Sequence, residues 1–418
     1  MEIFEINGIE TVLIKTDKFK TITFFITYLG EYNKEVATAK TLLSMLLSGS
    51  TKNYQTKKAI LNKLFSLYDA AISVHNFPIY KTNVQLFALN IINPKFVQNE
   101  NLLTESIEFL KEFIFNPNID NEGFTENEFN EKKRILRDNI NSIYNNKGLY
   151  AFRRLMQEMG KDEIISVNPM GTLEDLEKIT RSDIYDEYQK MINDEQIKIY
   201  VIGDIEKESI IENLKDFTFK KNGFDLQTVS YERKTIEKTN EVFETQNVNQ
   251  AKLMMGFRTN VNALDDLYVP MTVFNMMFGG MGSSDLFRVV REENSLAYTV
   301  SSSVFFDTCI MVVSAGIDSK DYELTTDLII KQLEKYKQGH VDENLMVIAK
   351  ENLISNINQT VDDPYANLNF VLKNNLLNNL TAEQLVEAIK NVTKEDIIKA
   401  SQKIELDTIY CLKGEANG

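Results

Sequence analysis

An arginine and a tyrosine, seven residues apart, are the side chains of this sequence best suited to bind a peptide backbone. Arg291 and Tyr298 follow a glycine-rich turn in the segment FGGMGSSDLFRVVREENSLAYTVSSS, which runs from Phe278 to Ser303. A guanidinium and a phenol both donate hydrogen bonds and can share one carbonyl or carboxylate acceptor. The same donors would stabilise the oxyanion that forms when a peptide carbonyl is attacked. The pair is therefore a candidate for peptide binding.

The predicted elements around the pair bring the two side chains within reach of each other. Three glycines in the turn permit positive φ angles and a close approach of the backbone: Gly279, Gly280 and Gly282. The apolar pattern predicts a short helix that ends at Arg291 and a strand over 296–306. Strict alternation would place Tyr298 on the same strand face as Val300, Ser302 and Val304.

Two other interpretations of this segment follow from the residues alone. Arg291 can pair with Glu292 or Glu293 at the surface while Tyr298 lies in the core. The glycines could also cradle a phosphate, but neither GxxxxGK[ST] nor a complete GxGxxG is present. The spacing therefore leaves a purely structural role open and gives little support to a phosphate site.

Histidine and cysteine provide no metal site in this sequence. A two-histidine zinc motif needs both rings on one helix face, but His75 and His340, the only two histidines, lie far apart. We expect His75 in a strand and His340 as an exposed residue after a helix. Cys309 and Cys411 lie in apolar, strand-like runs, which predicts buried, reduced thiols.

Composition excludes several classes of protein. The net charge of −15 disfavours a nucleic-acid binder, which needs a basic face to neutralise phosphates. No run of 18 apolar residues is present, and the first residues, MEIFEING, lack the apolar segment of a signal peptide. These features predict a cytoplasmic protein without a transmembrane segment. At 418 residues the chain is long enough for two or more domains.

The chain repeats itself at about half its length. The segment ITRSDIYDEYQKM at 179–191 matches VTKEDIIKASQKI at 392–404, and each is followed by an apolar strand that ends in a glycine, Gly203 or Gly414. Thr180 and Thr393 stand at matching positions and are expected to be helix N-caps. A helix and a strand that recur in the same order argue for a duplicated domain.

We predict an α+β fold of two duplicated domains, each a mainly antiparallel sheet with helices on one face. The predicted boundaries are an N-terminal domain at 1–216, a polar linker at 217–238 and a C-terminal domain at 239–418. In each half, strands come first and long amphipathic helices follow. The predicted strand regions are 11–28 and 242–258, and the predicted helices are 36–47, 101–115, 125–146, 267–278, 320–337 and 342–359.

The segment GGMGSSDLFRVVREENSLAYTVSSS resembles the C-terminal-domain signature of the pitrilysin/insulysin metallopeptidases, the family of mitochondrial processing peptidase. That signature is a glycine-rich turn, Ser-Ser-x-Leu-Phe and then Arg-Glu-x-x-x-Leu-x-Tyr. The resemblance extends over nearly the whole chain and implies a repeated α+β domain. It also implies that Arg291 and Tyr298, beside the glycine turn, bind the substrate backbone near the scissile bond.

The N-terminal half departs from the family pattern. Active members carry His-x-x-Glu-His on a helix and a further glutamate about 75 residues on. Here the matching helix reads VATAKTLLSMLLSGST, which places Lys40, Leu43 and Ser44 at the three motif positions and Asp138 at the later glutamate. Lysine repels zinc, leucine cannot activate water, and serine is a poor zinc ligand. We therefore expect no metal or other cofactor in this chain.

The resemblance implies a non-catalytic subunit of a heterodimeric zinc metalloprotease. The partner would be a homologous subunit that carries His-x-x-Glu-His and zinc, and the substrate would be an extended peptide. Paired genes of this kind occur in low-GC Gram-positive bacteria, and the composition, rich in Asn, Ile and Lys, suits such a source. The alternative is a peptide-binding or structural scaffold subunit with no protease role.

Overall fold

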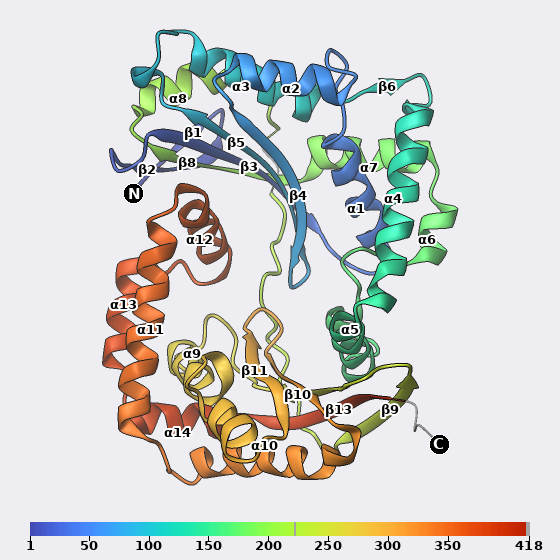
Figure 1. Cartoon of the computed structure of the whole chain (residues 1–418). Helices are drawn as coiled ribbons and strands as arrows, with labels where there is room; N and C mark the ends of the chain where they lie inside the picture. Colours follow the sequence, from blue (N-terminus) through green and yellow to red (C-terminus); the bar gives the residue numbers. More distant parts are fainter. Residues whose placement is uncertain (221–222, 415–418) are drawn as a thin grey trace. The chain divides into compact units, whose positions relative to one another are not determined.

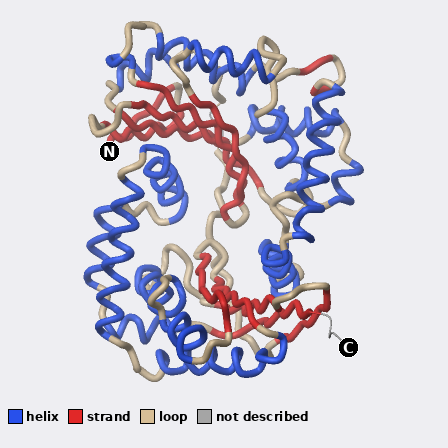
Figure 2. The backbone as a smooth tube through the Cα atoms, in the orientation of Figure 1, coloured by secondary structure: helices blue, strands red, loops and turns tan. Residues whose placement is uncertain are grey.

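The computed structural model describes residues 1–220 and 223–414 (Figure 1), and these residues form two compact units. Unit 1 comprises Met1–Asn141, Val167–Gln227 and Asp362–Leu372. Unit 2 comprises Ser142–Ser166, Thr228–Val361 and the chain from Lys373 onward. Each unit combines a sheet with helices, so the predicted α+β class is confirmed (Figure 2).

Unit 1 has a six-stranded sheet in the order β1-β2-β8-β3-β5-β4 within the described residues. Every neighbouring pair is antiparallel except β2 and β8, which run parallel. The predicted strand region at 11–28 covers most of β2 and most of β3. In sheet order, the strands are Glu2–Ile6, Ile9–Lys15, Gln196–Gly203, Thr21–Glu31, Thr82–Ile92 and Ala71–Ile79, and a small β6–β7 hairpin adds Ile119–Asp120 and Gly123–Phe124.

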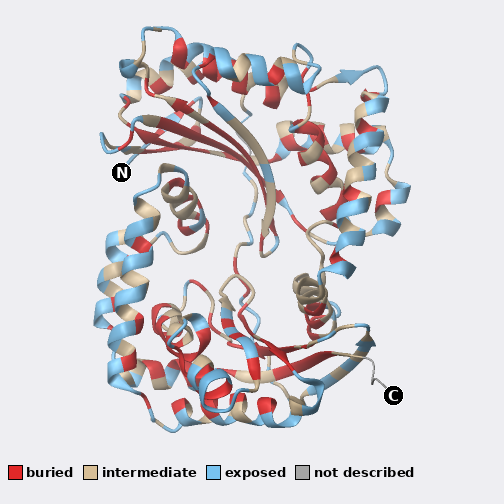
Figure 3. Cartoon of the chain, viewed as in Figure 1, coloured by how far each residue is buried: buried red, intermediate tan, exposed pale blue. Residues whose placement is uncertain are grey.

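The core of unit 1 lies between this sheet and its helices. Side chains from β3, β5 and β8 pack with those of α1, α3 and α7 in one apolar cluster. The central strands are buried over nearly their whole length, whereas the outer helix faces are exposed (Figure 3). The helices here are α1 Ala37–Leu47, α2 Lys57–Ser66, α3 Leu102–Phe115, α4 Glu126–Asn145, α6 Leu173–Lys178, α7 Arg181–Asp194 and α8 Lys207–Leu214.

Unit 2 has a five-stranded sheet in the order β11-β12-β10-β13-β9 within the same residues, antiparallel except for the β13–β9 pair. In that order the strands are Ala297–Phe305, Ile310–Ile317, Ala251–Arg258, Glu405–Gly414 and Asn240–Gln246. The helices are α5 Lys147–Met159, α9 Tyr268–Asn275, α10 Tyr322–Lys337, α11 Glu343–Val361, α13 Ala382–Asn391 and α14 Lys394–Gln402. Helix α12, Pro364–Leu377, begins in unit 1 and ends in unit 2.

The two halves of the chain use the same local devices, as a duplication requires. Thr180 caps α7 and Thr393 caps α14, and each forms a reciprocal capping box with the aspartate three residues on, which confirms both predicted N-caps. The two halves also share a lysine contact at a helix C-terminus, which was not predicted. Lys133 on α4 donates to the carbonyls of Glu177 and Ile179 at the end of α6.

Lys350 repeats the contact that Lys133 makes. From α11 it donates to the carbonyls of Lys390 and Val392 at the end of α13, at 2.9 and 2.6 Å. Each lysine thus satisfies carbonyls that a helix C-terminus leaves without partners.

Each unit includes one segment from the other half of the sequence. Residues 142–166 belong to unit 2, where α5 packs on β10 and β13. Residues 362–372 belong to unit 1, where the ring of Tyr365 meets Phe25 edge-on at 4.9 Å. This exchange of segments between the two units was not foreseen from the sequence.

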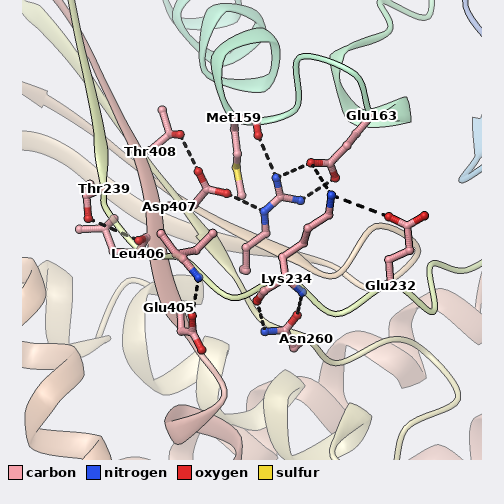
Figure 4. A network of polar contacts seen from close by, with 12 residues as sticks. Met159, Glu163, Glu232, Lys234, Thr239, Asn260, Glu405, Leu406, Asp407 and Thr408 are labelled. Carbon is pink, nitrogen blue, oxygen red and sulfur yellow. Dashed lines mark hydrogen bonds and ion pairs between the residues drawn. The ribbon is translucent and has the colours of Figure 1, made fainter.

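Arg258, at the end of β10, ties the exchanged segment to the sheet of unit 2. Its guanidinium donates to Asp407 at 2.7 Å, to both carboxylate oxygens of Glu163 at 2.8 Å and to the carbonyl of Met159 at 2.8 Å. Figure 4 shows Met159, Glu163 and Asp407 converging in this polar network. The side chain is almost fully buried, so each of these bonds replaces hydration that folding removes.

We predict that Arg258→Met destabilises unit 2 by about 3–5 kcal/mol, because it leaves the carboxylates of Asp407 and Glu163 without their buried counter-charge. Urea unfolding measures the loss. The matched control is Arg134→Met, since Arg134 is 63% exposed and only pairs along its own helix with Asp138, and it should cost less than about 0.5 kcal/mol. Equal unfolding midpoints for the two variants would contradict the role given to Arg258.

Candidate functional site

The predicted helix that ends at Arg291 is largely a π-helix. Helix α9 continues into a first π-helical turn at Met276–Gly280, and a second covers Phe287–Glu293. A π-helical turn has i→i+5 hydrogen bonds, which makes it wider than an α-helical turn, and such turns are frequent at functional sites. The sequence pattern could not distinguish this turn from an α-helix, because both place apolar residues on one face.

The glycines of the turn have ordinary backbone angles, and a close approach requires a glycine at Gly279 but not at Gly282. None of Gly279, Gly280 and Gly282 has a positive φ, so the turn does not use the backbone freedom that glycine permits. The predicted close approach is confirmed at Gly279, where a Cβ atom would lie 2.6 Å from the Ser302 hydroxyl oxygen. A glycine here therefore lets the π-helical turn lie directly against β11. A Cβ atom on Gly282 would meet only open space.

Arg291 and Tyr298 lie together at the surface of unit 2. The guanidinium carbon of Arg291 is 5.6 Å from the centre of the Tyr298 ring and 4.6 Å from that of Phe287. Tyr298 is 74% exposed, which contradicts the interpretation that it is a core residue. Glu293 pairs with Arg288, and within the described part of the chain the Arg291 guanidinium has no ion pair or hydrogen bond.

A β-bulge explains why Tyr298 is exposed. Ala297 pairs with Ile317 and Thr299 with Gly316, so Tyr298 is the extra residue between two consecutive pairs. Val300 and Ser302 are buried, whereas Tyr298 is not, and the simple alternation predicted for this strand therefore begins only after the bulge. Bulges commonly direct a side chain out of the regular pattern near functional sites.

Linked hydrogen bonds between polar side chains stabilise the start of the π-helical turn. The Tyr336 hydroxyl donates to one carboxylate oxygen of Asp285 at 2.5 Å, and Arg288 donates to the other at 2.7 Å. Burial and the neighbouring Asp285 carboxylate both raise the pKa of Tyr336, so its phenol stays protonated and keeps donating. The start of the turn is thereby fixed to α10.

The helix that would carry a zinc motif, α1, holds a buried lysine. Lys40 is 3% exposed, and its ammonium lies 2.5 Å from Glu195 and 2.7 Å from Glu187. Burial alone would lower the pKa of Lys40, but the two carboxylates outweigh it and raise that pKa. Gly30 leaves room for Glu195, because a Cβ there would lie 2.1 Å from its carboxylate oxygen. Lys40, which the sequence analysis matched to the first motif histidine, is thus a buried cation paired with two carboxylates.

The other positions matched to the zinc motif serve the fold. Leu43 is buried in the core of unit 1, and the Ser44 hydroxyl accepts from the side chain of Gln85 at 3.3 Å. Asp138 is 61% exposed and pairs with Arg134 on α4. An ammonium, a core leucine and a bonded hydroxyl are not a donor set for zinc. The residues at these positions do not fit the metal.

The histidines and cysteines considered in the sequence analysis belong neither to the turn that carries Arg291 nor to helix α1. His75 is exposed on the edge strand β4, and His340 is exposed after α10, as predicted for a post-helix residue. Cys309 and Cys411 are free and buried, as predicted, and burial raises the pKa of Cys411 to about 11. In residues 1–220 and 223–414, no three His, Cys, Asp or Glu side chains group as metal ligands, and no helix is long and apolar enough to cross a membrane.

The fold and the altered α1 helix define a class, the peptidase-like proteins that have lost their own zinc ligands. Residues 178–353 match the family described as the peptidase M16 inactive domain. The chain is 31% identical over 411 residues to the probable inactive metalloprotease YmfF of Bacillus subtilis, which covers 98% of this chain and 96% of that protein. The chain therefore belongs to the M16 peptidase family, and the resemblance to pitrilysin-type metallopeptidases is confirmed.

Solved structures agree with this assignment. A conserved protein from Enterococcus faecalis V583 superposes with a TM-score of 0.92 at 29% identity, covering 99% of this chain and 98% of the other. A protease from Helicobacter pylori shares the fold, with a TM-score of 0.80 at 16% identity and 99% coverage of both chains. The chain also matches the uncharacterized zinc protease YmfH of Bacillus subtilis, at 22% identity over 37% of this chain and 36% of that protein.

We predict that Lys40→Met destabilises unit 1 by about 3–5 kcal/mol at pH 7.5, because two buried carboxylates lose their counter-ion. Burial already raises the pKa of Glu195 above its ordinary value, and without Lys40 this pKa rises further. A raised carboxyl pKa gives stability that is complete in acid and is lost as the pH rises through the folded-state value. The deficit relative to the unmodified chain should therefore shrink towards pH 5.

Urea unfolding between pH 5 and 8 measures this dependence. Lys178→Met is the matched control, since Lys178 makes only an exposed pair with Glu174 one helical turn away, and it should change stability by less than about 0.5 kcal/mol at every pH. A Lys40→Met deficit that stays constant across this range would show that Glu195 does not titrate as described.

We also predict that the triple change Lys40→His, Leu43→Glu and Ser44→His does not create a zinc site in this chain. The new glutamate would enter the apolar core, and Asp138, the residue matched to the further metal ligand, is exposed and pairs with Arg134. Zinc titration by calorimetry and thermal unfolding should show no tight binding and a lower melting temperature. Tight, stoichiometric zinc binding with retained stability would contradict this expectation.

Proposed function

We propose that this chain is the non-catalytic, substrate-binding subunit of a heterodimeric zinc metalloprotease that processes peptides. Its partner in this proposal is a homologous subunit that carries His-x-x-Glu-His and the zinc ion. The observation that carries the proposal is the contrast between two positions of one chain. Lys40 is buried and pairs with two carboxylates, whereas Arg291 is exposed beside the exposed Tyr298, and its guanidinium has no ion pair or hydrogen bond within the described residues.

The geometry of the pair suits an extended peptide. Arg291 offers up to five N–H donors and Tyr298 one O–H donor, while a peptide backbone offers carbonyl acceptors at regular intervals. In the partner's active site, zinc would activate the attacking water. Arg291 and Tyr298 would bind the carbonyls beside the scissile bond, or the oxyanion itself, and hold the peptide in register.

The relatives support a division of labour between two chains. Bacillus subtilis has both a probable inactive metalloprotease, YmfF, and an uncharacterized zinc protease, YmfH, and this chain is similar to both. The similarity to YmfF extends over almost the full length of each protein. An inactive and a zinc-carrying homologue in one organism are the two components that a heterodimer of this kind needs.

We predict that Arg291→Ala or Tyr298→Phe lowers peptide turnover by the reconstituted pair roughly 10- to 1000-fold, because each removes donors to the substrate backbone or oxyanion. The partner is first isolated from the native host on the tagged chain and identified by its His-x-x-Glu-His sequence. Turnover is then measured on a library of internally quenched peptides. Matched controls are Arg134→Ala, which removes an exposed arginine of unit 1, and Tyr231→Phe, since Tyr231 is 75% exposed.

Two outcomes would count against the proposal. Unchanged turnover in both site variants would remove the substrate-binding role of Arg291 and Tyr298. Recovery of the chain alone, or within a complex that has no zinc-carrying homologue, would favour the alternative of a peptide-binding or structural scaffold.

A further inference from the structure

Phe287 lies beneath the guanidinium that the proposed function uses. Its ring is half-buried and takes no part in the core cluster of unit 1 or in the one formed by α5 with the sheet of unit 2. The Arg291 guanidinium lies over it at 4.6 Å and over Tyr298 at 5.6 Å. A cation held over aromatic faces loses little hydrogen-bonding capacity, because its N–H groups point outward in the guanidinium plane.

Arg288, the next residue, occupies carboxylates near Arg291. It donates to Asp285 at 2.7 Å and also pairs with Glu293. The partners Arg288 and Glu293 are five residues apart, which is the hydrogen-bond spacing of a π-helix. Asp285 is fixed from its other side by Tyr336.

We propose that Phe287 and Arg288 are positioning residues for Arg291. Phe287, with Tyr298, holds the guanidinium in one orientation, and Arg288 occupies Asp285 and Glu293 so that neither pairs with Arg291. The N–H edges of Arg291 are then free for an acceptor on the peptide. This inference rests on the proposed function for its substrate, but the state of Arg291 can be tested without any partner.

The first test measures the chemical reactivity of each arginine in the isolated, full-length chain. Phenylglyoxal modifies free guanidinium groups, and mass spectrometry of the digested protein gives the rate at each position. In Arg288→Gln, Glu293 is released and should pair with Arg291, which slows its modification about 2- to 5-fold, as expected for a surface ion pair. The double variant Arg288→Gln/Glu293→Gln should restore the rate, and Arg134 should react equally in all three proteins.

The second test asks whether Phe287 acts through Arg291. In the reconstituted pair, Phe287→Leu should lower kcat/KM about 3- to 30-fold, the range expected for the loss of a cation–π contact. Phe287→Tyr, which keeps a ring, should recover most of that loss. In an Arg291→Ala background, Phe287→Leu should have no further effect, because a residue that acts only through another has nothing left to position.

The matched control is Phe243→Leu. The centre of the Phe243 ring lies 3.8 Å from the Lys413 ammonium, and the ring does not belong to this turn. Thermal unfolding of each variant identifies any that fails to fold. If the effects of Phe287→Leu and Arg291→Ala are additive, or if Arg288→Gln leaves the modification of Arg291 unchanged, the inference is overturned. If the modification pattern holds but Arg291→Ala leaves turnover intact, the proposed function fails and the assignment of Arg288 stands.

Discussion

The hydrogen bonds of the buried Arg258 guanidinium are the interactions on which the structure of unit 2 depends. A charge in an apolar interior is tolerated only when its donors are satisfied, and here the acceptors come from β13 and from the exchanged segment that contains Met159 and Glu163. Arg258 pairs with Ile310 on β12, which in turn pairs with Phe305 on β11. Backbone pairing thus continues from Arg258 through β12 to Phe305, the last residue of β11, the strand that carries the bulge at Tyr298.

The two halves of the duplicated chain have used their polar side chains in opposite ways. In unit 1, the helix that matches the zinc motif gives its polar positions to the fold, where Lys40 joins α1 to α7 through Glu187 and Glu195. In unit 2, some polar groups at the π-helical turn stabilise the turn, and another is exposed to solvent. Asp285, Arg288 and Tyr336 bind one another, and Arg291 is left at the surface. The proposed role beside a zinc-carrying partner depends on this difference between the two units.

Much of this arrangement could be predicted from local sequence. The capping boxes of Thr180 and Thr393 depend on residues three apart, and the meeting of Arg291 with Tyr298 depends on a short helix followed by a strand. What could not be predicted depends on distant residues. Glu195 lies 155 positions from Lys40, and the extra residue at Tyr298 is defined only by its pairing with β12. Glycine permits both a positive φ and a close approach, and only the structure shows that Gly279 is required by its contact with Ser302.

The exchanged segments bear on how such a chain arose. Helix α5 follows α4 and completes unit 2, and the start of α12 follows α11 and completes unit 1. Two identical chains that trade one equivalent helix form a domain-swapped dimer, which is a low-cost route to association. Joining the end of one copy to the start of the next would give this topology in a single polypeptide. The chain thus has the topology of a domain-swapped dimer joined into one polypeptide, in which each unit includes a segment from the other half of the sequence.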